Sequence, residues 1–294
     1  MTRLARQQSL RAVAVCFLAV GWGQAFSQQT EPENAAANSA AAREKKPYTF
    51  TFKPVAIDTG AATGISLGVD YDFVGKYQFW TTQTGAGSDV VNPDDLDKTF
   101  RAGQFDLRAR GTLASSKEKN PNKLLDFAAN AVLKLNAPAY WAKLGGTLTF
   151  ETDQGFDNKQ QMFGLTGAVS KVGSFVPGDA GSVIVNYGTV NPTKDDVRKK
   201  LVGDLDSFRR WDLEISYSIP INKQKVRSID LDYRHYKEVS APAQISASGL
   251  DRNRVGLIRI NLDQDFCVQY SKGSLPFDQQ SQRAVKIGWT AKFE

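Results

Sequence analysis

The chain has 294 residues, with 37 lysines and arginines against 31 aspartates and glutamates, which gives a formal charge of +6 at pH 7. This mild positive balance does not indicate a nucleic-acid-binding protein, because such proteins carry a concentrated basic surface. With a single histidine and two cysteines, no zinc or haem site is expected, since those sites gather several such side chains.

The first 27 residues have the layout of a cleaved secretory signal peptide. Three arginines precede an apolar run over residues 12–23, and small residues suit cleavage after Ser27. The run is shorter than the roughly 20 apolar residues of a membrane-spanning helix. Its removal would take away three arginines and no acid, lowering the formal charge from +6 to +3. Cys267 would then be the only thiol, so no intramolecular disulfide is expected.

Residues 28–47 differ in composition from the rest of the chain. Gln, Glu, Asn and Ala dominate, and a short run of charged residues precedes Pro47. Polar segments without aromatic residues cannot bury enough apolar surface to fold alone. We therefore expect a flexible periplasmic leader, with a short alanine-rich helix that plugs the interior as the alternative.

From residue 48 onward, apolar and polar residues alternate in segments separated by turns rich in Gly, Pro, Asn and Asp. A side-chain period of two is the pattern of a β-strand with one apolar face. It predicts strands over residues 65–73, 76–83, 105–113, 127–135, 144–150, 160–172, 181–190, 211–219, 229–233, 253–262, 266–270 and 282–293. The alternation at 48–52 is either an additional strand or a periplasmic edge.

The connections between these strands alternate in length when the chain is followed back from its carboxyl end. Residues 273–281, 239–252 and 191–206 are long, whereas residues 263–264 and 221–225 are short. Long extracellular loops and short periplasmic turns produce this alternation in transmembrane barrels. Segments 84–100 and 115–123 break the rule, because both are long and one strand separates them. Either a strand is miscounted there or one periplasmic turn is unusually long.

The last predicted strand is the most specific feature of the chain. Val285, Ile287, Trp289, Ala291 and Phe293 alternate with polar or small residues. An aromatic-ended strand of this kind, in a chain with an export signal, resembles the final strand of a Gram-negative outer-membrane β-barrel. The resemblance covers residues 48–294 as a pattern, with one departure, because Glu294 follows the aromatic residue. It implies a porin-like barrel surrounded by outer-membrane lipid and inserted by machinery that recognises the carboxyl-terminal strand.

Aromatic residues also gather near the predicted strand ends, on the apolar side; Trp80, Trp141, Trp211 and Trp289 are among them. Membrane barrels carry such aromatic girdles at both lipid–water interfaces. A soluble, exported β-sandwich is the alternative, but it would not need this distribution. Leu275, Pro276 and Phe277 fall in the last extracellular loop, where they form a plain turn, contact a partner or fold inward as a constriction.

Catalysis is the least favoured interpretation. Barrel hydrolases pair a histidine with Ser, Asn or Asp. The one histidine, His235, shares the parity of Ile229, Leu231 and Tyr233, which places it toward lipid or the membrane rim. We therefore expect no catalytic residue, no metal and no cofactor, and replacement of His235 would test the hydrolase alternative.

The predicted inward face carries both signs of charge in similar number. The residues expected to line the interior include Arg108, Arg110, Lys134, Lys143, Arg210, Asp212, Glu214, Asp230, Asp232 and Arg234, within a wider inward set that also contains Asp265. Opposite charges on neighbouring strands stabilise a sheet, so ion pairs that fill a narrow interior are favoured over an acid/base pair or a calcium site. A channel for acidic sugars should show an arginine excess, which this wall lacks.

The sequence thus predicts an all-β protein, a single antiparallel transmembrane β-barrel of about twelve strands (ten to fourteen) over residues 48–294. The favoured function is a small porin-like channel for passive passage of small polar solutes, without enzymatic activity. The competing function is a closed structural, adhesive or partner-binding barrel whose loops 191–206 and 239–252 form the contact surface. The expected partners are outer-membrane lipid, the insertion machinery and small polar solutes, and not nucleic acid.

Overall fold

The computed structural model describes residues 48–58, 65–83, 99–115, 125–137, 139–223, 225–278 and 281–293. The predicted signal peptide and leader, residues 1–47, lie outside the described residues. The strands are β1 (Tyr48–Asp58), β2 (Ser66–Gln83), β3 (Phe100–Ala114), β4 (Leu125–Ala137), β5 (Tyr140–Thr152), β6 (Lys159–Val172), β7 (Ala180–Lys194), β8 (Phe208–Lys223), β9 (Val226–Val239), β10 (Arg252–Leu262), β11 (Phe266–Gly273), β12 (Gln282–Trp289) and β13 (Ala291–Phe293). Two short helices are also described, α2 (Asp196–Val202) and α3 (Ala243–Ser248), together with a 3-10 turn, η1 (Asp263–Asp265).

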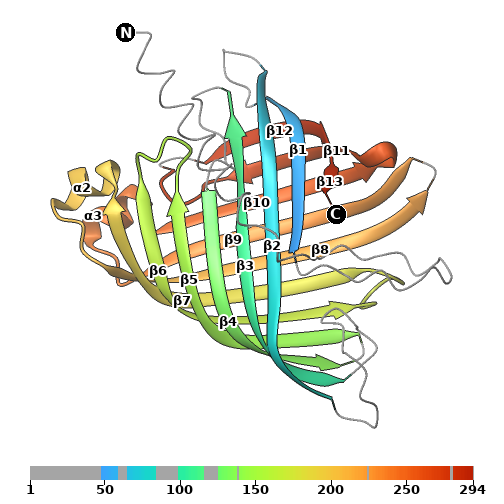
Figure 1. The fold of residues 1–294 in the computed structure, drawn as a ribbon. Helices are drawn as coiled ribbons and strands as arrows, with labels where there is room; N and C mark the ends of the chain where they lie inside the picture. Colours follow the sequence, from blue (N-terminus) through green and yellow to red (C-terminus); the bar gives the residue numbers. More distant parts are fainter. Residues whose placement is uncertain are drawn as a thin grey trace.

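The strands form one closed antiparallel sheet (Figure 1). Each strand pairs with the next along the chain, and β1 pairs with β2 on one side and with both β12 and β13 on the other. Because β12 and β13 follow one another along the same edge of β1, they occupy one position in a barrel of twelve strands. A closed barrel has no exposed edge. The predicted fold class, an antiparallel barrel of about twelve strands, is confirmed.

The barrel is apolar on its outside and polar on its inside. Leu144 and Phe163 are 67% and 71% exposed on the outer wall, whereas Gln104, Glu151 and Lys286 are almost completely buried inside. A soluble protein has the opposite distribution, and a transmembrane barrel has this one. The arrangement is the one that the resemblance to outer-membrane barrels implies. Neither described helix is long or apolar enough to cross a membrane.

The alternation in the sequence is what sets the two faces. On β5, Leu144 and Leu148 point outward while Thr147, Thr149 and Glu151 are buried inside. The pairing of β4 with β5 runs without a break from one end of the strands to the other. Since a shift of one residue would exchange the two faces, the apolar pattern and the register support one another.

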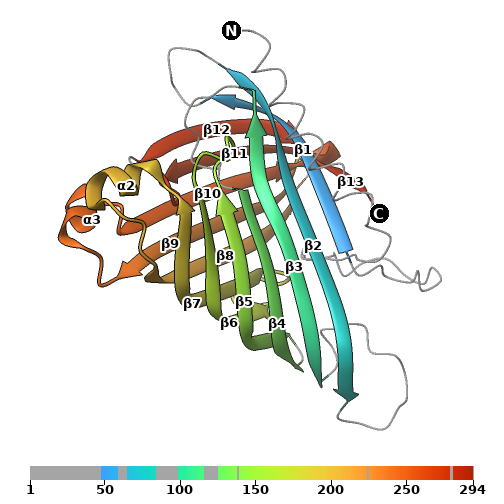
Figure 2. The ribbon, with the colours of Figure 1, turned by 60° about the vertical axis from the view of Figure 1, so that its left-hand side comes forward.

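The two ends of the barrel differ. Tyr48, at the start of β1, and β13 lie at one end, here called the termini end, where residues 173–179 and η1 connect strands. The opposite end, here called the loop end, carries α2, α3 and the connection between β11 and β12. Figure 2 shows α2 and α3 beside one another beyond the ends of β7 to β10.

Near the amino end, one strand prediction needs correction and one of two predicted alternatives is confirmed as a strand. Residues 65–73 and 76–83 form a single strand, β2, because Val74 and Gly75 continue the ladder by pairing with Arg108 and Leu107 of β3. A bulge at Gln78 to Trp80 is the only register shift in that pair. The alternation at 48–52 is part of a full strand, β1, which closes the barrel.

The same region explains the two long connections. One strand, β3, separates them, so the connection from β2 to β3 joins strand ends at the termini end and the connection from β3 to β4 joins ends at the loop end. Strand β3 pairs directly with β2 and with β4, so no described strand lies between them. Of the two predicted alternatives, the described strands favour one unusually long connection at the end with short turns.

Trp141 also differs from its predicted place. It lies on the inward face, where the Lys143 ammonium nitrogen is 5.1 Å from its ring centroid. Its position is odd-numbered whereas the outward residues Leu144 and Leu148 are even-numbered, so strict parity along β5 predicts the inward face. Trp80 and Trp289 are exposed on the outer wall, as predicted.

Candidate functional site

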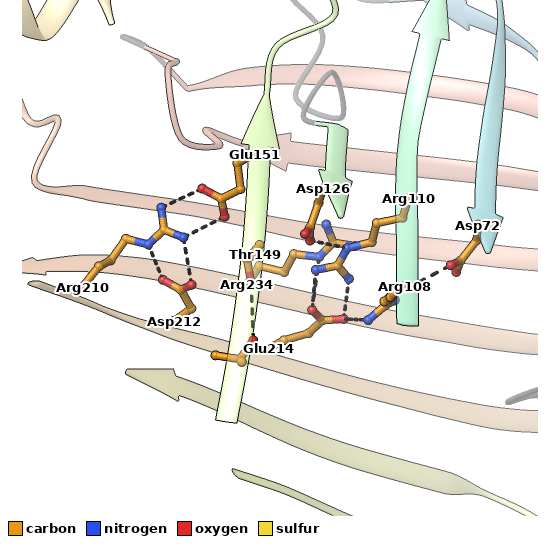
Figure 3. A network of polar contacts seen from close by, with 11 residues as sticks. Asp72, Arg108, Arg110, Asp126, Thr149, Glu151, Arg210, Asp212, Glu214 and Arg234 are labelled. Carbon is orange, nitrogen blue, oxygen red and sulfur yellow. Dashed lines mark hydrogen bonds and ion pairs between the residues drawn. The ribbon is translucent and has the colours of Figure 1, made fainter. Parts of the chain in front are cut away.

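The candidate site is the charged interior of the barrel, where side chains from distant strands meet (Figure 3). Strand β3 presents Arg108 and Arg110 inward, and β8 presents Glu214 inward. Strands β4 to β7 lie between β3 and β8 in the sheet. Contacts between these residues therefore cross the interior from one wall to the other.

Glu214 is the centre of this crossing. Its carboxylate accepts hydrogen bonds at 2.7 Å from Arg110 Nη1 and 3.3 Å from Arg108 Nη1, and the second oxygen lies 2.7 Å from Arg110 Nη2. Arg234 on the neighbouring strand β9 places Nε 3.9 Å from the same carboxylate. A two-pronged pairing of guanidinium with carboxylate is strong and directional, so it holds opposite walls of the barrel together.

The two arginines of β3 also have acidic neighbours on their own side of the barrel. Arg110 Nε donates to Asp126 Oδ2 of β4 at 2.9 Å, and Arg108 Nε lies 3.8 Å from Asp72 Oδ1 of β2. The set Asp72, Arg108, Arg110, Asp126, Glu214 and Arg234 is called the waist cluster below. It contains three cations and three anions, so its formal charge is balanced.

A second cluster lies nearer the loop end and is buried. Arg210 of β8 contacts both oxygens of Glu151 on β5, at 2.7 and 2.9 Å, and both oxygens of Asp212, at 2.6 and 2.9 Å. Gln160 Nε2 donates to Glu151 at 2.5 Å. The side chains of Arg210 and Glu151 are 5% and 3% exposed. Their charges are satisfied by one another and not by water.

Glycines explain how Arg210 reaches a strand that is not its neighbour. The inward positions beside Arg210 are Gly188 on β7 and then Gly164 on β6, paired in register. A Cβ on Gly164 would stand 2.1 Å from the Tyr187 carbonyl oxygen, so no larger residue fits this close approach. Because neither position carries a side chain, the guanidinium of Arg210 crosses both strands to Glu151.

Further ion pairs line the remaining wall. Lys286 of β12 donates to Asp70 of β2 at 2.7 Å and to Thr112 of β3 at 2.8 Å, which ties the strands across β1. Lys143 of β5 donates to Asp106 of β3 at 2.5 Å. These contacts join strands that are not neighbours in the sheet. They therefore stabilise the barrel in addition to the backbone hydrogen bonds between neighbouring strands.

The waist cluster and the cluster around Arg210 differ in their exposure to solvent. In the waist cluster, the side chains of Asp72 and Arg108 are 47% and 30% exposed, while the cluster around Arg210 is nearly dry. Asp72 Oδ1 and Arg108 Nε, 3.8 Å apart, form an ion pair without a hydrogen bond. The partly exposed side chains of Asp72 and Arg108 are accessible to solvent, whereas those of Arg210 and Glu151 are buried.

The structure brings most of the sequence-predicted residues into these clusters. Arg108, Arg110, Arg210, Asp212, Glu214 and Arg234 belong to the two clusters above. Asp230 accepts from Ser218 at 2.8 Å and from Asn261 at 2.6 Å, and Asp232 lies opposite Ser216 in register. Lys134 is buried, with its ammonium nitrogen 5.2 Å from the ring centroid of Phe100.

Two predicted features of the interior are wrong or incomplete. Asp265 lies in η1 and pairs with exposed Arg227 at 2.9 Å, so it belongs to a surface turn and not to the interior. The pairing was also expected between neighbouring strands, whereas the strongest contacts of Glu214 and Arg210 reach β3 and β5.

His235 lies on the outer face, where its ring stacks on Trp211 with centroids 4.8 Å apart.

Sequence reasoning missed three charged residues of the interior. Arg259 of β10 lies 3.9 Å from Asp230, and its parity opposite to exposed Ile258 and Ile260 was a usable signal. Arg198 and Glu238 form a buried pair at 2.6 and 2.8 Å. No strand pattern could have found Arg198, because it lies on α2, where Asp195 caps the helix by accepting its backbone N–H at 2.8 Å.

The connection between β11 and β12 folds into the loop end of the barrel. Leu275 is buried against Tyr236 and Val255, with Phe277 packed on the same cluster. Its backbone is fixed by Leu275 N–H donating to Asp278 Oδ2 at 2.9 Å, and Phe277 has a φ of 76°, which bulky residues rarely adopt. Of the alternatives for these apolar residues, inward folding is the one that the structure shows.

Beneath this connection lies a recess of about 500 Å3, including its open mouth. Its walls come from α2, from the loop-end residues of β6, β8, β9 and β10, and from Pro276 and Phe277. The guanidinium of Arg198 lies 4.0 Å from the ring centroid of Phe208, and that of Arg210 lies 5.1 Å from Tyr236. The recess therefore sits directly over the Arg210 cluster.

No protein-family model matches the chain, and no curated protein matches it in sequence. Among solved structures, the chain is similar to a NanC porin, with 8% identity, 83% of this chain and 100% of that chain covered, and a TM-score of 0.47. It is also similar to the outer-membrane channel DcaP of Acinetobacter baumannii, with 10% identity, 84% and 96% covered, and a TM-score of 0.41. For an outer-membrane channel from Pseudomonas putida F1, the identity is 12%, the coverage 90% and 100%, and the TM-score 0.33. The barrel architecture itself is established by the strand pairing of this chain.

Proposed function

We propose that the protein is an outer-membrane channel for passive passage of small polar solutes, with its constriction at the waist cluster. The supporting observation is the position of Asp72 and Arg108, which are charged, inward-pointing and yet partly exposed. A barrel that served only as a scaffold would gain nothing from wetted charges in its interior. Residues of both signs at a narrow passage would select solutes by charge and size.

The apolar outer wall supports the outer-membrane location. Large residues such as Leu67, Phe163 and Leu165 are more than half exposed there, and in water such a surface would drive aggregation. With the termini end in the periplasm, the loop end with α2 and α3 faces the outside. This is the orientation in which barrels carry their longer loops outward.

The competing function, a closed barrel with a structural or partner-binding role, is favoured by one specific observation. Arg108 and Arg110 meet Glu214 across the interior, and the Arg210 cluster behind them is almost dry. Together these contacts narrow the interior in the described conformation. The two functions therefore differ in whether ions and solutes cross the waist cluster.

Single-channel recording in planar bilayers decides between them. The purified full-length protein should give steady ohmic current steps, and Glu214→Gln should increase the conductance and shift its preference toward anions. The reason is that Arg108, Arg110 and Arg234 would lose their shared carboxylate. Asp263→Asn is the matched control, because it removes one carboxylate charge from an exposed turn at the termini end. Absence of current steps from both the natural protein and Glu214→Gln, at any voltage, would reject the channel and support the closed barrel.

A further inference from the structure

The outer wall of the barrel changes in character toward the loop end of β9 to β12, four strands that are neighbours in the sheet (Figure 1). Nearer the termini end, its outward residues are apolar or aromatic; Leu231, Ile258, Tyr270 and Val285 are among them. Toward the loop end, the outward positions include five cations, called the outer basic patch below: Lys237, Arg252, Arg254, Lys272 and Arg283. In the described residues of these four strands, no aspartate or glutamate occupies an outward position.

The location of the patch places it at the level of the lipid headgroups. A lysine or arginine on the lipid face of a barrel is strongly unfavourable at the middle of the bilayer and close to neutral at its surface. On β11, Lys272 is the next outward residue after Tyr270, and on β12, Arg283 directly precedes outward Val285. The patch therefore borders the wall that faces hydrocarbon, and its charged groups reach the polar layer beyond it.

Like charges stand opposite one another in the patch. Lys237 pairs in register with Arg252, and Lys272 pairs with Arg283. Directly opposite side chains on neighbouring strands have Cβ atoms about 4.5–5.5 Å apart, and two like charges at such positions destabilise a sheet. Asp251 relieves the first pair, because its carboxylate forms ion pairs with Lys237 and, at 3.5 Å, with Arg252. Among the described residues, no acid forms an ion pair with Lys272 or Arg283, so an external anion would stabilise this second pair.

Arg254 and Gly256 extend the second pair into a site for a larger anion. Gly256 lies directly opposite Lys272, and Arg254 is the next outward residue on the same strand. Arg254 also has no ion pair with a described residue. A Cβ on Gly256 would meet no atom within 4 Å, so the space outside the wall between Arg254 and Lys272 is open. Asp58 of β1 pairs one outward position nearer the termini end than Arg283, and it is one carboxylate beside three cations.

A phosphate group suits three neighbouring cations, because its oxygens accept hydrogen bonds from several arginine and lysine side chains at once. We propose that Arg254, Lys272 and Arg283 bind the phosphate of an anionic lipid at the outer surface of the membrane. The acyl chains of this lipid lie on the adjoining wall over Tyr270 and Val285, which favours a lipid over a soluble phosphate. The site rests on the membrane location and orientation in the proposed function, and it does not depend on conduction.

Native mass spectrometry of the folded full-length protein, released from uncharged detergent micelles, tests the site. The probes are dioleoyl phosphatidic acid and dioleoylglycerol, which share their acyl chains and differ by the phosphate. Phosphatidic acid should bind at least tenfold more tightly, and excess inorganic phosphate should not displace it. The double variant Lys272→Gln, Arg283→Gln should weaken its binding about tenfold or more, because each cation near an anionic lipid surface contributes several-fold to the affinity. Arg254→Gln alone should weaken it about three- to fivefold.

The matched control is the double variant Lys171→Gln, Arg227→Gln, which removes the same charge from exposed positions at the termini end. It should leave the binding of phosphatidic acid unchanged. Heat-modifiable electrophoretic mobility checks that each variant is folded. Folding should persist in the variants of the patch, because the substitutions remove repulsion between like charges.

The outcomes separate this proposal from the channel function. Equal binding of phosphatidic acid and dioleoylglycerol, an equal loss in the two double variants, or displacement by inorganic phosphate overturns the lipid site. Current steps in bilayers together with any of these results would leave the channel standing. Binding of phosphatidic acid that is lost only in the variants of the patch, in a protein that conducts no current, supports the site and rejects the channel.

Discussion

At the scale of single residues, the interior depends on arginines that have two partners each. Arg110 joins Asp126 and Glu214, and Arg210 joins Glu151 and Asp212. A guanidinium with two acidic neighbours keeps one of them when the other is lost. One acidic partner can therefore neutralise the charge of the arginine even when the partner that links it to a distant strand is removed.

The Arg210 cluster should contribute more to stability than any exposed ion pair of the barrel. Glu151→Gln removes the partner on β5 and leaves a buried guanidinium with Asp212 alone, so we expect about 3 kcal/mol of destabilisation. Asp263→Asn breaks an exposed pair with Arg227 at 3.6 Å and should change stability by about 1 kcal/mol or less. Urea-dependent folding into lipid vesicles measures both. Equal, small effects would contradict the assignment of a bracing role to Arg210.

Parity along the strands was sufficient to place Arg110, Arg210 and Glu214 on the inner face. It was insufficient to name their partners, because the contact of Arg110 with Glu214 depends on how many strands close the ring and how sharply they curve. That geometry is a property of the whole sheet. Arg198 was invisible to the same reasoning, since its place depends on a helix in a connection.

At the scale of elements, the connection from β6 to β7 is fixed by one carboxylate. Asp179 accepts backbone N–H groups from Ser174, Phe175 and Val176 at 2.6, 2.8 and 3.1 Å, and a hydrogen bond from the Tyr217 hydroxyl. Burial alone would raise the pKa of Asp179, but these hydrogen bonds lower it to about 2. The order of this turn therefore depends on Asp179 remaining deprotonated.

The order of this turn should be lost only in strong acid. Because the pKa of Asp179 is lowered by folding, its stabilising effect is complete above its ordinary value of 3.8 and disappears as the pH falls through about 2. Hydrogen-exchange protection of the Ser174, Phe175 and Val176 amides should thus persist from neutral pH to about 4 and decline below it. In Asp179→Ala the same amides should lack protection at every pH. Protection that declines near pH 6 would show that another group holds the turn.

The connection from β11 to β12 should be held in the barrel mouth by Leu275. Leu275→Ala leaves a cavity against Tyr236 and Val255, and we expect the local stability of the connection to fall by about 2 kcal/mol. Cleavage by an added protease within residues 274–281, in vesicles that contain the folded protein, should become faster by at least tenfold. Ile258→Ala, on the outer wall, is the control that should leave this cleavage unchanged. An unchanged cleavage rate in Leu275→Ala would mean that the rest of the connection suffices to hold it.

Periodicity predicted most strands to within a few residues, and it failed where the pattern changed inside a strand. On β2, Val74 and Gly75 interrupt the apolar-out alternation although the ladder continues through them. On β1, Pro54 lies within a strand, a position where proline removes a ladder hydrogen bond. Only pairing with β2, β12 and β13 shows that this segment spans the barrel.

At the scale of the whole molecule, the distribution of polar and apolar residues predicts the compartment. Expressed with residues 1–27 intact in a Gram-negative host, the protein should appear in the outer-membrane fraction and stay there in carbonate or urea. The apolar outer wall is the reason, since it requires lipid or detergent. Amino-terminal sequencing of the membrane-bound form should begin after Ser27. Recovery of the folded protein from the periplasmic fluid without detergent would contradict both the membrane location and the channel.

Closure of the ring joins the first described strand to the last, and this has a consequence for biogenesis. Along that junction Phe50 to Phe52 pair with β13 and Val55 to Asp58 pair with β12, while Thr290 between them donates its N–H to Asp265 instead. The described barrel can close only when β12 and β13 are present to pair with β1. A chain without these strands would leave the backbone N–H and C=O groups along that edge of β1 unpaired in hydrocarbon, which is strongly unfavourable.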